Sequence, residues 1–198
     1  MKMKESFFYS LEVQMEQKRE VISVWPLNTG KHVKGLVKVI FGESITVFPL
    51  MLMEGKRGYY LSFPKIGQEN KPIRPIGKFL YYEANRQLTE DVLRTYLPNT
   101  PLCREFRMKE ALHIQCKVYP CDKRIDCMVA RASIVLNQQI QIDGIRMFVL
   151  VDGVKMVLFP ERDYYKHGEI ELRRVVDFKN EKEGEIIEEL WSIYDAMR

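Results

Sequence analysis

The sequence predicts an α+β protein made of two tandem units, each a small antiparallel β-sheet followed by a C-terminal helix. Three observations predict this fold. A strand-like stretch occurs twice at a nearly constant offset, apolar residues alternate within both copies, and each copy ends in a segment with helical spacing. We expect the units to span residues 1–98 and 99–198, with the boundary near Leu97 to Pro101.

The internal repeat is the observation on which this architecture depends most. At an offset of 95, residues 37–41, 45–47 and 50–52 align with residues 132–136, 140–142 and 145–147. At an offset of 96, residues 61–64 (Leu-Ser-Phe-Pro) align with residues 157–160 (Val-Leu-Phe-Pro). Because the second copy lies beside the first in one chain at high effective concentration, we expect the two units to pack as an intramolecular pseudo-dimer.

The matched segments have the two-residue period of half-buried antiparallel strands. In the first copy, Val37 and Val39 fall on the face opposite Lys38, and in the second copy Ile134 falls opposite Ser133. Gly42-Glu43 and the segment 55–58 are expected to form hairpin turns. An additional strand is expected over residues 7–15, where Phe, Tyr, Leu, Val and Met alternate with other residues.

The end of each copy has the spacing of an amphipathic helix. Leu88, Val92 and Tyr96 recur every four residues, and Thr89 with the following two acidic residues predicts a cap and first turn. At the C-terminus the apolar residues that recur are Ile186, Leu190, Ile193 and Met197, opposite an acidic face. A third, short helix is expected to begin at Thr100, with Pro101 in the first helical position.

Composition restricts the class of protein. Hydrophobic residues make up 46% of the 198 residues and charged residues 29%, which predicts a packed core. No apolar run approaches the roughly 20 residues that span a bilayer, and the first residues lack the apolar stretch of a signal peptide, so we expect a cytoplasmic protein without membrane association. The four cysteines fall within residues 103–127, which favours reduced thiols over a disulfide framework.

Metal binding and catalysis find little support in the motifs. His113, Cys116, Cys121 and Cys127 lack the paired C-x-x-C spacing of zinc sites, and Cys116 and Cys127 fit better as small apolar strand residues. The three histidines lie in unrelated contexts, and no nucleophile elbow, phosphate-binding glycine loop or zinc-protease motif is present. We therefore expect no enzyme, no metal, no cofactor and no small-molecule substrate.

Both copies carry motifs of one known family. In the second copy they are residues 132–136 (Ala-Ser-Ile-Val-Leu), 145–146 (Ile-Arg), 152–153 (Asp-Gly), 159–160 (Phe-Pro) and 168–170 (Gly-Glu-Ile). In the first copy they are residues 21–24, 28–30 (Asn-Thr-Gly), 50–51 (Leu-Met), 54–55 (Glu-Gly) and 63–65 (Phe-Pro-Lys). In order and spacing, both copies resemble the SpoVG (stage V sporulation protein G) family of bacterial septation regulators.

The resemblance implies a fold and a function. Members of this family have a small antiparallel sheet and a C-terminal helix, form dimers, and bind DNA and RNA as regulators. The first copy departs from the family pattern at Pro49 and lacks the acidic residue between Thr29 and Gly30, whereas the second has Glu161 where the family has small or basic residues. We therefore expect the two copies to differ in role, and further self-association remains open.

Nucleic-acid binding requires a local cluster of cations, because several phosphates must be neutralised together. Residues 1–100 contain 15 Lys and Arg against 10 Asp and Glu, whereas residues 101–198 contain 16 against 17. The first copy supplies Lys65, Lys71, Arg74 and Lys78 on a Pro-rich connection, with Lys34 and Lys38 on the polar strand face. The second supplies Arg162, Lys166, Arg173 and Arg174, which nearby acidic residues nearly cancel. The first copy is therefore the better candidate surface for DNA or RNA.

Alternatives to nucleic-acid contact remain at this point. Charged clusters on loops are usually only solvated surface, and Tyr60, Tyr81 and Tyr82, which could stack on a single strand, are more often packed in a core or at an edge. The second hypothesis is a protein-interaction module of a septation or mobile-element regulatory complex, which would use the acidic C-terminal helix and exposed sheet edges.

Overall fold

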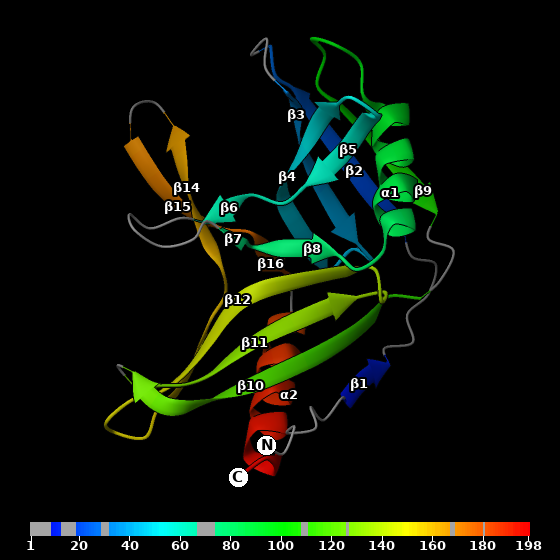
Figure 1. The fold of residues 1–198 in the computed structure, drawn as a ribbon. Coiled ribbons are helices and arrows are strands. Elements are labelled where there is room, and N and C mark those ends of the chain that lie inside the picture. Colours follow the sequence, from blue (N-terminus) through cyan, green and yellow to red (C-terminus); the bar gives the residue numbers. More distant parts are fainter. Residues whose placement is uncertain are drawn as a thin grey trace.

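The computed structural model describes residues 9–12, 19–28, 32–66, 74–107, 111–125, 127–166, 169–179 and 181–198. It is an α+β fold in which antiparallel strands predominate, and it has two helices in these ranges. Two sheets lie one above the other in Figure 1 and share a core. We call residues 1–98 the first half of the chain and residues 99–198 the second half.

The upper sheet in Figure 1 is built mainly from the first half. Its strands are β2 (Arg19–Pro26), β3 (Val33–Phe41), β4 (Ile45–Gly55), β5 (Gly58–Ser62), β9 (Leu102–Arg107) and β16 (Val176–Phe178). They follow the order β16-β4-β3-β2-β9, with β5 also paired to β4. Two of these strands, β9 and β16, come from the second half.

The lower sheet is built mainly from the second half. Its strands are β1 (Tyr9–Glu12), β8 (Gly77–Phe79), β10 (His113–Ile125), β11 (Met128–Leu136), β12 (Ile140–Val149) and β13 (Lys155–Leu158). They follow the order β1-β10-β11-β12-β13, with β8 also paired to β12. Here β1 and β8 come from the first half, so each sheet contains strands from the other half of the chain.

Two ribbons and two helices complete the described structure. The ribbons pair β6 (Lys65–Ile66) with β7 (Arg74–Pro75) and β14 (Glu161–Lys166) with β15 (Glu169–Arg174). The helices are α1 (Tyr82–Thr95) and α2 (Lys182–Ala196). Both predicted helices are present and bury the predicted apolar faces, through Leu88 and Val92 in α1 and through Ile186 and Leu190 in α2.

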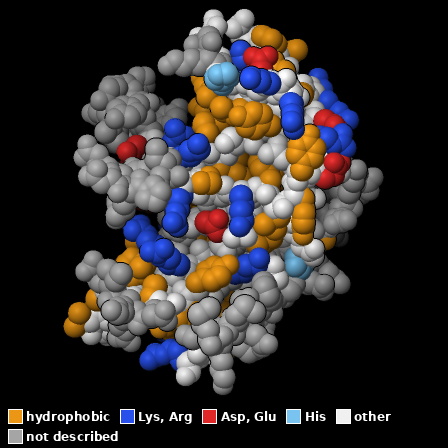
Figure 2. All heavy atoms as spheres, in the orientation of Figure 1, with side chains coloured by type: hydrophobic (Ala, Val, Ile, Leu, Met, Phe, Trp, Pro, Cys, Tyr) orange, Lys and Arg blue, Asp and Glu red, His pale blue; other side chains and the backbone are white. Residues whose placement is uncertain are grey.

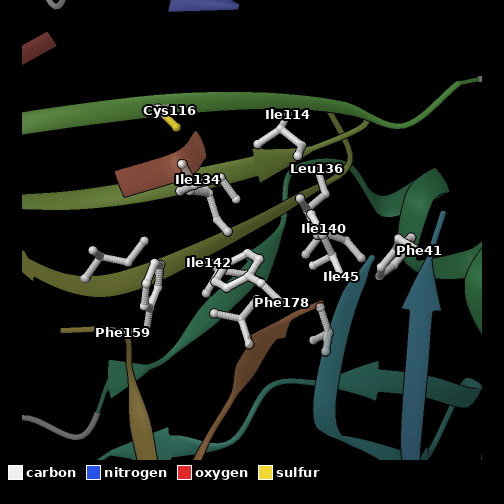
Figure 3. Close-up of a cluster of buried hydrophobic side chains, with 14 of the residues drawn as sticks. Phe41, Ile45, Ile114, Cys116, Ile134, Leu136, Ile140, Ile142, Phe159 and Phe178 are labelled. Carbon is white, nitrogen blue, oxygen red and sulfur yellow. The ribbon is translucent and has the colours of Figure 1, made fainter. Parts of the chain in front are cut away.

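The core joins the two halves. Figure 3 shows Phe41 and Ile45 of the upper sheet close to Leu136 and Ile140 of the lower sheet. All four side chains are at most 4% exposed. Since burial of each large aliphatic side chain contributes roughly 1.5–3 kcal/mol, this shared layer stabilises the association of the halves.

The alternation predicted for the first copy is confirmed in β3, where Val37, Val39 and Phe41 are buried while Lys38 is half-buried. The alternation predicted for the second copy is wrong in β11, because Ser133 is buried as well as Ile134, so both faces of this strand are covered there. The predicted turn at Gly42-Glu43 is also present. The φ of Gly42 is 53°, a value that glycine adopts without strain, and the φ of Glu43 is 64°.

Three predictions about the boundaries of elements need correction. The short helix expected at Thr100 is wrong, because the chain enters β9 at Leu102 and pairs with β2. Helix α1 begins at Tyr82, well before the cap expected at Thr89. The additional N-terminal strand is described only as β1, which pairs with β10, and the rest of residues 7–15 lies outside the described residues.

No helix in the described part of the chain is both long and apolar enough to cross a membrane.

Candidate nucleic-acid interface

A groove of about 500 Å³ lies between β5, β8 and the beginning of α1. Tyrosines, phenylalanines and lysines are among the side chains that line it. The tyrosines and lysines among the described lining residues are Tyr60, Tyr81, Tyr82, Lys65 and Lys78. No described lining residue is acidic, so the groove combines aromatic surface with positive charge.

Asn85 fixes the wall of the groove formed by α1. Its side-chain amide donates to the carbonyl oxygen of Leu61 at 2.8 Å, and its Oδ1 accepts from the Leu61 backbone N–H at 3.1 Å. Thr89 Oγ1 donates to the same Oδ1 at 3.0 Å. These bonds tie the first turns of α1 to the edge of β5, and so they position Tyr81 and Tyr82.

Strand β8 forms the opposite wall and is held by the lower sheet. Lys78 lies directly across from Gln141 of β12. Beyond the paired residues, the Leu80 N–H donates to Gln139 O at 2.8 Å and the Asp143 N–H donates to Ile76 O at 2.7 Å. Lys78 is therefore attached to the second half of the chain, although it belongs to the first.

Three of the predicted cations have their charges available: Lys65 and Lys78 line this groove, and Arg74 directly precedes the lining residue Pro75. Lys65, Arg74 and Lys78 are all exposed and come from β6, β7 and β8. None of them forms an ion pair with a described acidic side chain. Figure 2 shows Lys and Arg side chains gathered across the middle of the visible face, over the region of β6 to β8. In its described residues, the segment expected to be a Pro-rich loop instead forms the strands β6, β7 and β8.

The predicted strand-face cations of the first half are partly engaged. Lys34 Nζ lies 2.8 Å from a carboxylate oxygen of Glu54. Lys38 Nζ lies 5.8 Å from the centre of the Trp25 ring. These two lysines lie outside the described lining of the groove and carry less available charge.

The predicted cations of the second half are largely neutralised. Arg173 bonds Glu171 at 2.8 Å, and Arg174 bonds Glu183 at 2.8 Å while its guanidinium lies 5.5 Å from the Phe159 ring. Arg162 is half-buried and lies across from Arg173 in the β14–β15 ribbon.

Two predicted cations can be placed only in part or not at all. Lys166 lies at the end of β14, but its side chain is outside the described residues, and Lys71 is outside them entirely.

The three groove tyrosines differ from the expectation that they are packed. Tyr60 is 44% exposed, Tyr81 is 62% exposed and Tyr82 is 83% exposed. These exposed side chains line the groove between β5, β8 and the beginning of α1.

Sequence reasoning missed two cations on the lower sheet. Arg131 of β11 and Arg146 of β12 lie directly opposite each other and are both exposed. Tyr119 of β10 lies across from Arg131 and is 45% exposed. Like charges opposite each other disfavour pairing unless an anion compensates them. The repeat alignment could have located this pair, because it places Arg131 and Arg146 on adjacent strands.

The cysteines and the histidine discussed above do not gather into a metal site. Within the described ranges, no three or more His, Cys, Asp or Glu side chains lie together in a way that could hold a metal ion. Cys116 is 2% exposed, and burial raises the pKa of its thiol to about 12, so it is a small apolar core residue. Cys127 lies in the turn before β11 with a φ of 63°, not within a strand.

Comparison with known proteins finds a family model that matches the part of the chain that carries the groove. Residues 18–97 match the SpoVG family model. The matched range includes all described residues that line the groove. It covers the first half of the chain, so it does not extend to the second copy of the repeat. No curated protein and no solved structure matches the chain.

Proposed function

We propose that this protein is a non-enzymatic regulator that binds DNA or RNA through Lys65, Arg74 and Lys78. The observation that carries the proposal is that Lys65 and Lys78 line a groove whose described lining has no acidic residue, with the exposed Arg74 next to the lining residue Pro75. Cations held on paired strands neutralise several phosphates at once and release condensed counterions, which drives binding. The SpoVG match supports the regulatory role, and the matched residues lie in the half of the chain that carries these cations.

The proposal includes two tandem SpoVG-like units that pack as a pseudo-dimer. Equivalent irregularities in the two sheets support it. The register between β3 and β4 shifts between Val37 and Val39, and the register between β11 and β12 shifts between Ala132 and Ile134. These positions differ by 95 residues, which is the offset of the sequence repeat. Because bulges are specific local features of a strand pair, their coincidence favours a common origin of the two sheets.

The exchange of strands between halves further supports a pseudo-dimer. The Phe48 N–H donates to Val175 O at 2.9 Å beside β16, and the Asp143 N–H donates to Ile76 O at 2.7 Å beside β8. Phe178 of β16 lies across from Ile45, just as Phe79 of β8 lies across from Ile140. Contacts that each unit makes reciprocally with the other are typical of an isologous interface.

A gel-shift panel tests nucleic-acid binding. Wild type is compared with the variant K65E/R74E/K78E on duplex DNA, single-stranded DNA and RNA. We expect retention by the wild type, which weakens steeply with salt, and its loss in the variant. Exposed Lys56, Arg104 and Lys179 do not line the groove and supply a control, K56E/R104E/K179E, with the same change in net charge. Equal loss in both variants would mean that overall charge, and not the groove, binds the nucleic acid.

A protein-interaction module is the second candidate, and the surface of α2 favours it. Glu181 and Glu188 are exposed there, and β13 lies at an edge of the lower sheet. A partner that is retained after nuclease treatment and by K65E/R74E/K78E would favour this function over nucleic-acid binding.

A further inference from the structure

We propose that the groove binds one single strand of nucleic acid per chain, with bases stacked on Tyr60, Tyr81 and Tyr82. This inference rests on the proposed nucleic-acid binding and adds the class of ligand, the mode of contact and the stoichiometry. It depends on an arrangement of aromatic and basic side chains that the equivalent positions of the second half do not repeat among the described residues.

The tyrosines are free to receive bases. Their side chains make no hydrogen bond or ring contact with a described residue, in contrast to neighbouring Tyr59, whose ring centre lies 6.4 Å from that of Tyr96. Stacking requires the exposed face of an unpaired base, which a single strand offers and a duplex hides. The chemistry of the groove therefore favours a single strand.

Positive charge borders the aromatic surface on two sides. Lys65 and Lys78 line the groove together with the tyrosines, so phosphates between stacked bases would lie near ammonium groups. Bases and backbone thus find complementary surfaces in the same groove.

The corresponding surface of the second half has the opposite charge. The repeat places Met156 at the position of Tyr60, Glu161 at that of Lys65 and Asp177 at that of Lys78. The four residues that precede and begin α2, Lys179–Lys182, include no aromatic residue. A symmetric dimer would have two equal grooves, whereas at these equivalent positions the described part of the chain keeps the aromatic and basic residues in the first half. One strand should therefore bind per chain.

The decisive experiment separates stacking from charge. The probes are a twelve-nucleotide oligothymidylate and an abasic strand of the same length, which keeps the phosphates and lacks the bases. The variant Y81A/Y82A removes two exposed rings, and Y59A on the same strand as Tyr60 is the control outside the groove lining. Fluorescence anisotropy measures both affinities, and calorimetry measures the stoichiometry.

We expect wild type to bind oligothymidylate at least tenfold more tightly than the abasic strand. Stacking of a base on an aromatic side chain corresponds to about five- to hundredfold in affinity, so Y81A/Y82A should lose at least tenfold toward oligothymidylate and little toward the abasic strand. Y59A should keep the wild-type preference, and calorimetry should show one strand per chain.

The other outcomes overturn the inference. If Y81A/Y82A binds both probes like wild type and binding remains salt-dependent, the proposed function stands and stacking is wrong. A twelve-base-pair duplex that competes as well as the single strand, or two strands bound per chain, would also contradict the inference. If neither probe nor duplex binds, the proposed function fails together with it.

Discussion

Replacement of Gly77 by alanine is the sharpest test of how β8 joins the halves. A Cβ atom at this position would lie 2.7 Å from the backbone oxygen of Gln141 and 2.8 Å from ring carbons of Phe63. Both neighbours are held in place: Gln141 belongs to β12, and the buried Phe63 ring packs 5.4 Å from that of Phe79. Neither can move aside without loss of the β8–β12 pairing.

The magnitude follows from the packing. Insertion of a methyl group into a tightly packed site costs roughly 1–3 kcal/mol, and we expect G77A to lower the free energy of unfolding by about 2 kcal/mol. With a urea dependence of about 2 kcal/mol per molar, the midpoint of unfolding should fall by about 1 M. Equilibrium urea unfolding followed by circular dichroism measures this shift.

Gly184 offers the matched control, because it receives the same substitution in α2 with no atom within 4 Å of the added Cβ. G184A should raise the free energy of unfolding by up to about 1 kcal/mol, since alanine favours the helix. An unchanged or raised midpoint for G77A, with the expected gain for G184A, would refute the close approach of β8 to β12.

Two further predictions concern α1 and its surroundings. Burial, reinforced by Asp91, raises the pKa of Glu20 to about 7. Because the folded state binds the proton more tightly, stability should fall as pH rises from about 4.5 to about 7. E20Q should remove most of this loss in the free energy of unfolding, which is on the order of 2 kcal/mol because the group is partly exposed. An equal pH dependence of the urea midpoints in wild type and E20Q would contradict this prediction. N85A leaves the polar groups of Leu61 without their partner and should cost about 1–3 kcal/mol while weakening binding to oligothymidylate. Unchanged unfolding and binding in N85A would show that Asn85 does not position the groove.

The strands of both sheets could be predicted because their period is local. Alternation around Val37 depends only on neighbouring residues and on one buried face, whereas β11 around Ile134 is buried on both faces and was located through its match to the first copy. The repeat offset was informative for the same reason, since it matched whole strand pairs together with their bulges. Helix α1 was located by Leu88 and Val92, but its beginning was not, because Tyr82 is exposed and lies outside the apolar stripe.

The exchange of strands could not be predicted. Strand β8 has three residues, too few for a period, and its partner Ile142 lies in the other half of the chain. The Thr100-Pro101 helix signal was misleading, because the edge of β2 provides hydrogen-bond partners for Leu102 and the residues after it. Propensity is a weak prior where tertiary pairing competes with it.

The groove was only partly accessible from the sequence. The charge of one segment indicated Lys65 and Lys78, which line the groove, whereas the exposure of Tyr81 and Tyr82 could not be predicted, since tyrosine suits both cores and surfaces. Arg131 and Arg146 were missed because their adjacency is a matter of register, and neither belongs to a run of charge.

The salt dependence of oligothymidylate binding tests the central claim most directly. Wild type and K65E/R74E/K78E are titrated between about 50 and 200 mM salt, and log K is plotted against log salt concentration. Three phosphate contacts contribute a slope of about −2 for a single strand, so the variant should bind more weakly with a slope less steep by about 2. Weaker binding in the variant with an unchanged slope, or wild-type binding that does not depend on salt, would contradict the account.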